Sequence, residues 1–214
     1  MNPNIPNLNR LILHLLVLTC CSCLIHQPAH AGAWAQPRGH VYTKVSGISY
    51  RADEVYNDMG RRQEMGINND EFSGRQMFIY VEYGLLEDLT LVSQARAGVL
   101  TDEDTFVRME TAGVGDLELG LKYQLVDLPA VLSPMVSLKV PTGYHSRYDP
   151  PLGTGEFDVE ARLLVSKSLY PLPVYAGLEG GYRLRGGVFS NQWLWSAEVG
   201  ASPHARLFSK IFVT

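Results

Sequence analysis

Cysteine is nearly absent from this sequence, and all of it lies near one end. The chain has 214 residues and three cysteines, Cys20, Cys21 and Cys23, so no disulfide framework and no cysteine-based metal site extends through its body. An excess of basic charge is also lacking, because 18 Lys+Arg face 22 Asp+Glu for a formal net charge of -4. This balance excludes a basic nucleic-acid-binding module, and a hydrophobic content of 46% excludes a disordered tail. We therefore expect no nucleic-acid partner.

A long apolar run occurs only in the first 31 residues. The stretch 11–25 follows a basic residue and precedes small residues that end at Ala31, which is the three-part plan of a secretory signal peptide. The sequence predicts a signal peptide over 1–31, cleaved after Ala31, and one domain over 32–214. The apolar stretch is shorter than the about 20 residues of a membrane-spanning helix. A lipoprotein acylated at Cys20 is the alternative, although the small residue usual directly before the cysteine is missing.

Helical periodicity is absent beyond residue 32, and an alternation with period two recurs instead. In the clearest run, Leu117, Leu119 and Leu121 alternate with polar residues and glycine, as in a strand that is apolar on one face only. The composition agrees, with 20 Gly, 12 Pro and 11 Tyr. We expect an all-β chain with strands over 40–50, 76–85, 89–98, 116–125, 135–140, 157–165, 174–184 and 192–201, and a ninth, partial strand over 207–213.

The links between these strands alternate in length. Short turns on one side and longer loops on the other are typical of an up-and-down transmembrane β-barrel, in which the short turns are periplasmic. A soluble sandwich or lipocalin-like barrel has no reason to sort its loops in this way. The predicted long links are 50–75, 100–115, 142–156 and 185–191, and the short ones are 86–88, 126–130, 170–173 and 202–205.

The polar face of the predicted strands carries many charges. A dry soluble core would need to pair nearly all of them, whereas the lumen of a barrel holds charges beside water or in ion pairs. The apolar face would then point outward, with Tyr83 and Tyr123 near the periplasmic end and Phe157, Tyr182 and Trp193 near the outer end, as aromatic girdles. The candidate lumen-lining residues are Arg96, Glu118, Lys122, Lys139, Asp158, Glu160, Arg162, Glu179, Arg183 and Arg185.

Five blocks of sequence resemble a known family in their order and spacing. They are VEYGLLEDLTL (81–91), GVGDLELGLKYQL (113–125), VSLKVPTG (136–143), LGTGEFDVEARL (152–163) and GGYRLRGG (180–187). Together they resemble the outer-membrane β-barrel transporter family of the phenol-degradation MetA-pathway type, over about residues 80 to 200. The resemblance implies an outer-membrane barrel of a Gram-negative bacterium that passes small solutes, aromatic or apolar ones among them. It supplies no catalytic or binding residues.

Two features depart from the pattern of such barrels. Pro134 and Pro141 bracket one predicted strand and leave an uninterrupted interior too short to span a membrane. The chain also ends at Thr214 on a partial ninth strand, whereas bacterial single-chain barrels have an even strand count and usually end in an aromatic residue. We expect an antiparallel up-and-down transmembrane barrel of about 8–10 or more strands. The odd count indicates a chain truncated or frameshifted at its C-terminus, or a count that is off by one.

The charges on the strands over 157–165 and 174–184 have two interpretations. They form either a charged constriction that selects solutes or a ladder of cross-strand salt bridges that fills a small barrel, and we favour the ladder. In the loop before residue 150, His145 and Asp149 are too few for a metal site, so we expect ordinary turn chemistry there. No nucleophile motif is present, and Ser190 and His204 are at best weak candidates for an enzyme.

The expected function is therefore a passive or facilitated channel in the bacterial outer membrane, with no enzymatic activity, cofactor or metal. Its expected partners are the membrane lipid, lipopolysaccharide and a small solute. The alternative is a closed barrel with a structural or surface-interaction role.

Overall fold

The computed structural model describes residues 32–57, 59–65, 70–126, 129–144, 149–204 and 207–214. The predicted signal peptide and all three cysteines lie outside these residues, so cleavage after Ala31 stays a prediction. All the named elements are β-strands, as the alternation predicts. None of the described residues belongs to a helix long and apolar enough to cross a membrane.

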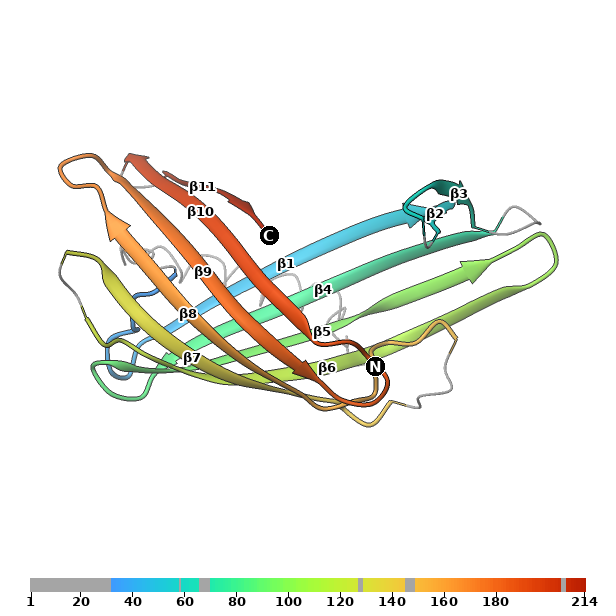
Figure 1. The fold of residues 1–214 in the computed structure, drawn as a ribbon, viewed down its shortest axis with the longest axis horizontal. Helices are drawn as coiled ribbons and strands as arrows, with labels where there is room; N and C mark the ends of the chain where they lie inside the picture. The colour runs from blue at the N-terminus through green and yellow to red at the C-terminus, as the bar shows by residue number, and fades with distance from the viewer. Residues whose placement is uncertain (1–31, 58, 66–69, 127–128, 145–148, 205–206) are drawn as a thin grey trace, which may run out of the picture.

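Nine strands form one antiparallel sheet in which each strand pairs with the next one along the chain (Figure 1). A two-stranded hairpin, β2 (Glu54–Tyr56) with β3 (Arg62–Glu64), stands in the link between the first two of them. This up-and-down order is the predicted one. The nine strands are β1 (Val41–Ala52), β4 (Glu71–Gly84), β5 (Leu89–Glu103), β6 (Arg108–Tyr123), β7 (Val131–Val140), β8 (Asp158–Ser168), β9 (Val174–Arg185), β10 (Gln192–His204) and β11 (Leu207–Val213).

The sheet is curled, so that β7 to β10 cross in front of β1 to β6 in Figure 1. Strands β1 and β11 are its two edges, and no ladder joins them within the described residues. Both edges nevertheless contribute to the same interior, because Lys44 of β1 and Lys210 of β11 line one cavity. The fold is thus an all-β, antiparallel, barrel-like sheet with an inner and an outer face.

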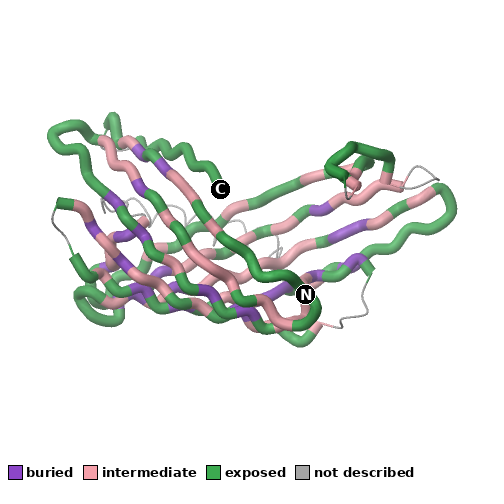
Figure 2. Tube along the Cα trace, viewed as in Figure 1, coloured by how far each residue is buried: buried purple, intermediate pink, exposed green. Residues whose placement is uncertain are grey.

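The outer face is apolar and the inner face is polar, which inverts the arrangement of a soluble β-protein. On β8, Val159, Leu163 and Val165 are 45%, 48% and 38% exposed, while Asp158 and Glu160 between them are only 1% and 4% exposed. Buried positions also recur between exposed ones on β4, β6 and β10, whereas every residue of the edge strand β11 is exposed (Figure 2). Since each buried charge needs a partner, the interior must be held together mainly by ion pairs and hydrogen bonds.

The predicted long link over 100–115 is wrong, because most of it is strand. β5 continues to Glu103 and β6 begins at Arg108, so only 104–107 form the turn. A β-bulge hid this extension: the register of β5 with β6 shifts between Ala95 and Ala97. Opposite the shift, two successive residues of β6 face Arg96. The carboxylate of Asp116 pairs with Arg96, and a Cβ atom added to Gly115 would collide with the Arg96 side chain. Two successive residues on one face change the phase of a period-two pattern, so the alternation is interrupted here.

The prediction that two prolines leave β7 too short is also wrong. β7 has 10 residues and runs through Pro134, which is paired with Leu163 of β8. On its other side the ladder with β6 stops at Met135, one residue away. Proline has no N–H to donate, so it is tolerated where a ladder is interrupted. A tilted strand needs about 9–11 residues to cross a bilayer, and β7 meets that length.

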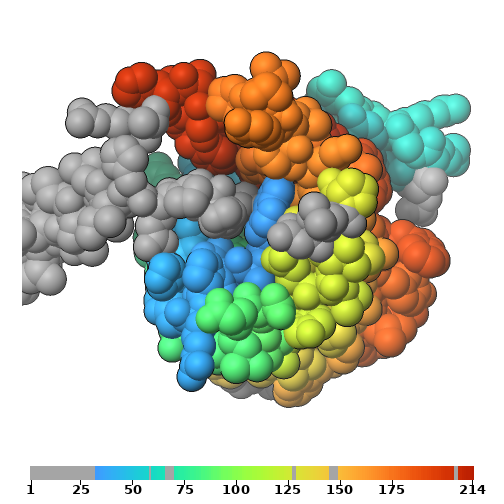
Figure 3. Space-filling model, turned by 90° about the vertical axis from the view of Figure 1, so that its left-hand side faces the viewer, coloured from blue at the N-terminus to red at the C-terminus, as the bar shows by residue number. Residues whose placement is uncertain are grey.

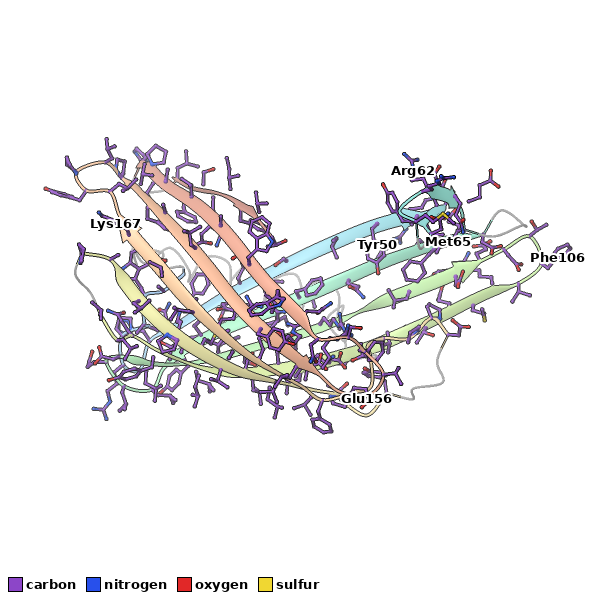
Figure 4. All side chains as sticks on the ribbon, viewed as in Figure 1. Tyr50, Arg62, Met65, Phe106, Glu156 and Lys167 are labelled. Carbon is purple, nitrogen blue, oxygen red and sulfur yellow. The ribbon has the colours of Figure 1, made fainter. Side chains whose placement is uncertain are left out.

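The two ends of the curled sheet differ in their connections. One end, here called the short-turn end, carries the turns 85–88, 124–130 and 169–173. The opposite end, the loop end, carries the β2–β3 hairpin, the turn 104–107 and the links 141–157 and 186–191. Figure 4 shows Lys167 towards the first end and Phe106 at the tip of the β5–β6 hairpin at the second. The predicted alternation in link length holds only in part: the loop-end links 104–107 and 186–191 have four and six residues, fewer than the seven of 124–130 at the short-turn end.

Candidate functional site

The inner face of the sheet surrounds a cavity of about 520 Å³. All nine strands of the sheet contribute to its lining, which makes it a property of the whole curled sheet. Its aromatic rings come from β1, β4 and β11, whereas charged groups come from β1, β4, β6 and β8 to β11. The principal lining side chains are Tyr42, Lys44, Tyr80, Glu82, Gln94, Glu118, Lys122, Ser137, Glu160, Arg162, Glu179, Glu198, Phe208, Lys210 and Phe212.

A network of ion pairs crosses the middle of this lining. Arg162 on β8 forms an ion pair with Glu160 on its own strand, and its Nη1 lies 3.1 Å from Oε2 of Glu179 on β9. Arg183 on β9 returns to Glu160 at 2.6 Å and lies 3.9 Å from Glu118 on β6. The charges therefore neutralise one another across three strands while leaving the cavity beside them, so features of both interpretations of the sequence are present.

A second network lies nearer the loop end. The Nζ atom of Lys139 is 2.7 Å from Oδ2 of Asp158 and 3.6 Å from Oδ2 of Asp116. Arg96 pairs with Asp116 at 3.1 Å, and Arg185 lies 3.8 Å from Asp158. Both carboxylates are almost wholly buried, and each has two cationic neighbours. Such an arrangement compensates part of the cost of removing a carboxylate from water.

In addition to these two networks, a buried charge pair lies towards the short-turn end. The Nζ atom of Lys122 is 3.1 Å from Oε1 of Glu82, and the two side chains are only 1% and 4% exposed. Tyr80 donates a hydrogen bond of 2.6 Å to the same carboxylate, and Gln36 donates one of 2.8 Å to its other oxygen. Every acceptor oxygen of Glu82 is thus occupied by a buried donor.

Gln36 belongs to a segment that sequence reasoning missed, residues 32–37, which lies inside the short-turn end. Ala33 is fully buried and packs with Val131 and Leu164, and the ring of Trp34 meets the ring of Tyr175 edge-on, with centroids 5.5 Å apart. Figure 3 looks at this end, where blue atoms of the first described residues lie among the atoms of the later strands. We call residues 32–37 the inner segment. It covers much of this mouth.

Strand side chains hold the inner segment chiefly by its backbone. Ala33 donates its N–H to Ser166 at 3.0 Å, and its carbonyl accepts a hydrogen bond from Ser133. The other three bonds come from β5, β6 and the turn that follows β6. Lys122 donates to the carbonyl of Gly32 at 3.0 Å, Ala35 donates to Gln124 at 2.8 Å, and Gln36 donates its N–H to Thr90 at 2.8 Å.

At the loop end, described residues of the link 141–157, namely Tyr144 and Leu152, lie against β6. Leu152 is 5% exposed. Its side chain packs against Gly113, in the space that a Cβ atom on that residue would need. Tyr144 donates a hydrogen bond of 2.6 Å to Asp116 and accepts one of 2.7 Å from Gly155. Burial, and then the hydrogen bond to Asp116, raise the pKa of Tyr144 from 10.0 to about 12. The phenol therefore stays neutral and keeps donating over the physiological range.

All ten candidate lumen-lining residues lie on the inner face or in its ion pairs. Glu118, Lys122, Glu160, Arg162 and Glu179 line the cavity itself. The other five, Arg96, Lys139, Asp158, Arg183 and Arg185, lie in the networks just described. That any of them selects or guides a solute stays a prediction.

Several interior residues were missed although the alternation could have found them. Lys44 alternates with the exposed Val41 and Val45 of β1, and Glu198 and Lys210 fall on the inner face by the same parity. In contrast, no local pattern marks the inner segment, because all its partners lie far away in the sequence.

The weaker candidates for chemistry do not come together. Ser190 precedes β10 at the loop end and His204 ends β10, so the 13-residue strand separates them, roughly 40 Å at about 3.3 Å per residue. His145 lies outside the described residues, while Asp149 is exposed. Within the described ranges no group of three His, Cys, Asp or Glu side chains is arranged to hold a metal ion.

The fold is similar to that in a crystal structure of an outer membrane channel from Pseudomonas putida F1. The two chains are 21% identical, the match covers 81% of this chain and 69% of the channel, and the TM-score is 0.53. At this identity the likeness shows the fold, which confirms the predicted antiparallel barrel class. No family model and no curated protein matches the chain, so the phenol-degradation MetA-pathway type stays a prediction.

Proposed function

We propose that this chain forms an outer-membrane β-barrel channel through which small solutes move down a gradient. The observation that carries the proposal is the inverted sheet: apolar side chains outside, and ion-paired charges around a cavity of about 520 Å³ inside. Such a wall accommodates water and polar solutes without a cofactor. The similarity in fold to an outer membrane channel supports the proposal.

The outer face supports a place in a membrane. Leu178 and Trp193 are 63% and 82% exposed, and in water such apolar surface would cost about 25 cal/mol per Å². Tyr123 near the short-turn end and Phe157 near the loop end are also exposed, as the aromatic girdles of a barrel would be. Lipid and lipopolysaccharide would contact this face. Closed barrels often resist unfolding by detergent, so a change of gel mobility on boiling tests insertion; a mature protein that is soluble without detergent would contradict it.

The covered mouth favours a second candidate, a closed barrel with a structural role. The inner segment contacts side chains of β4 to β9 at the short-turn end, and the link 141–157 packs inside the loop end. If both obstacles are permanent, no solute passes. If the inner segment is displaced, the cavity continues through the mouth.

Single-channel recording in planar bilayers separates the two candidates. We expect stepwise currents from the wild-type protein, and changed current amplitude and ion selectivity in Arg162→Ala, because Arg162 lines the cavity. Arg62→Ala is the matched control, since Arg62 pairs with Glu54 on the exposed β2–β3 hairpin away from the cavity. Currents that appear only when residues 33–37 are deleted would assign the resting closure to the inner segment. A stably inserted protein that is silent in both forms would support the structural role.

The lining also bears on the class of solute. Tyr42, Tyr80 and Phe212 bring aromatic rings to the same cavity lining as Arg162 and its partners Glu160 and Glu179. This combination fits small aromatic solutes that carry a polar or anionic group, which is narrower than the aromatic or apolar solutes implied by the resemblance. Block of the current by benzoate but not by cyclohexanecarboxylate is the expected result. Equal block by both would remove the aromatic preference and leave the channel proposal intact.

A further inference from the structure

Two buried polar groups beside Gly32 can accept further hydrogen bonds. Glu198 on β10 is 9% exposed and Ser166 on β8 is 2% exposed. One carboxylate oxygen of Glu198, Oε2, pairs with Lys210. The other, Oε1, is buried and accepts no hydrogen bond of regular geometry among the described residues, although the phenol of Tyr175 lies beside this carboxylate. A buried carboxylate oxygen without a donor is costly, so the site calls for a positively charged or N–H group.

The backbone at Gly32 is held in place next to this oxygen. Lys122 donates to the carbonyl of Gly32 at 3.0 Å, and the next N–H, of Ala33, donates to Ser166 at 3.0 Å. The position of the Gly32 Cα atom is therefore determined by bonds on its carboxyl side. Those bonds do not depend on what precedes Gly32 in the chain.

The geometry at Gly32 fits a nitrogen where a side chain would not fit. A Cβ atom built on Gly32 would lie 2.6 Å from Oγ of Ser166 and 3.1 Å from Oε1 of Glu198. These distances are too short for a carbon atom, but they are hydrogen-bond distances for a nitrogen. A Cα–N bond of about 1.46 Å is close in length to a Cα–Cβ bond. If Gly32 were the first residue of the chain, rotation about its Cα–C bond would place its amino nitrogen in the direction in which the Cβ atom was built.

We propose that the α-ammonium group of Gly32, freed by cleavage after Ala31, binds between Glu198 and Ser166 inside the barrel. The proposal rests on the predicted cleavage site and is independent of whether the barrel conducts. Hydrolysis by the export peptidase adds water across the bond between Ala31 and Gly32. It leaves a carboxylate on the leader and an amine on Gly32, which takes up a proton. The ammonium then supplies up to three donors, of which Glu198 and Ser166 accept two.

This site gives processing a structural role. Before cleavage, the nitrogen of Gly32 is an amide with a single N–H and no charge, and Glu198 lacks its second partner. After cleavage, a buried ion pair fixes the first residue of the inner segment.

The test measures the reactivity of the amino terminus in the exported, processed protein purified in its folded form. A succinimidyl ester at neutral pH acylates α-amines preferentially, since their pKa of about 7.7–8.0 is below that of lysine. Mass spectrometry then follows the N-terminal peptide. We expect it to begin at Gly32 and to react about tenfold or more slowly in the folded than in the denatured protein, as a charge-assisted bond of about 1.5–3 kcal/mol implies.

Variants assign the protection to Glu198. Glu198→Gln should restore most of the reactivity, whereas Glu87→Gln, in the exposed turn of the same mouth, should not. Tyr175→Phe removes the phenol that lies beside Glu198 and should leave the amine protected. If Glu198→Gln does not fold, Ser166→Ala, which removes the other acceptor, provides the same readout. A mature chain that starts elsewhere, a folded wild type that reacts as fast as the denatured one, or full protection in Glu198→Gln would each overturn the proposal.

Discussion

The two ends of the barrel are both covered from inside, but by opposite means. At the short-turn end, the inner segment is bound through its backbone, and the strands supply the side chains, among them Ser133, Ser166 and Lys122. At the loop end, the link 141–157 supplies the side chains itself. Tyr144 reaches Asp116, and Thr154 accepts a hydrogen bond of 2.5 Å from Lys139.

This difference determines where sequence matters at each end. A segment held by its backbone tolerates changes in its own side chains, because the specificity lies in the wall that surrounds it. A loop held by its own side chains depends on them directly. The wall around the inner segment should therefore be sensitive to mutation, whereas a position of the segment that is held by its N–H, such as Ala35, should be largely insensitive. The reverse balance is expected within the loop.

The largest effect is expected from Lys122→Met in the wall of the short-turn end. The substitution leaves Glu82 buried without its cation and removes the donor to Gly32, which should lower the free energy of unfolding by about 3–5 kcal/mol. Urea unfolding in detergent measures the loss. The double variant with Glu82→Gln should recover part of it. A loss no greater than that of Arg108→Met, in an exposed pair worth about 0–1 kcal/mol, would contradict a structural role for this pair.

Tyr144→Phe tests the loop end and should have a smaller effect. The variant removes the hydrogen bond donated to Asp116 and the acceptor for Gly155, while Arg96 and Lys139 still hold the carboxylate. We expect the free energy of unfolding to fall by about 1–2 kcal/mol. Tyr56→Phe, at an exposed position on β2, is the control and should be neutral. If both variants behave alike, the loop is not held by its phenol.

The same tyrosine predicts a dependence on pH. Its pKa is raised in the folded protein to about 12 from an ordinary 10.0, by burial first and then by the bond to Asp116. The stability it contributes is therefore complete below pH 10 and is lost as the pH rises through about 12. The difference in unfolding midpoint between wild type and Tyr144→Phe should shrink over this window. A difference that stays constant would show that the phenol does not titrate with folding.

The smallest effect is expected from Ala35→Ser within the inner segment. Ala35 is held by its N–H, which donates to Gln124 at 2.8 Å, and the substitution leaves that bond in place. The free energy of unfolding should change by no more than about 0.5 kcal/mol. Gln124→Ala, which removes the acceptor, should cost about 1 kcal/mol. If Ala35→Ser lowered the free energy of unfolding more than Gln124→Ala, the contrast between backbone and side-chain anchoring would be wrong.

Local pattern was enough to predict most of the sheet. The alternation at Leu117, Leu119 and Leu121 indicated both the strand and the face that turns outward. It failed where the backbone departs from regular pleating: the bulge at Gly115 and Asp116 reverses the phase, so the first half of β6 was missed. Pro134 led to a wrong strand boundary for a related reason: the ladder between β6 and β7 is interrupted beside it, but the strand itself continues.

The candidate site was predictable on the strands and unpredictable in the inner segment. Parity along each strand places Glu160, Arg162 and Glu179 on the inner face. Which charges pair with which depends on register, and register is a property of the neighbouring strands. The backbone of Ala33 carries no pattern that reveals its partner Ser166, because any residue other than proline offers the same N–H.

The long sequence separation of the inner segment's contacts imposes an order on assembly. Ala33 and Ser166 are 133 positions apart, and Ala33 and Ser133 are 100 apart, so the loops that these bonds close are among the longest in the fold. Contacts of this kind form late, because the entropy of closure is compensated only once the intervening strands are in place. The first residues of the domain to be synthesised are thus among the last to be immobilised. Resistance of this segment to proteolysis would therefore mark the moment at which folding of the surrounding sheet is complete.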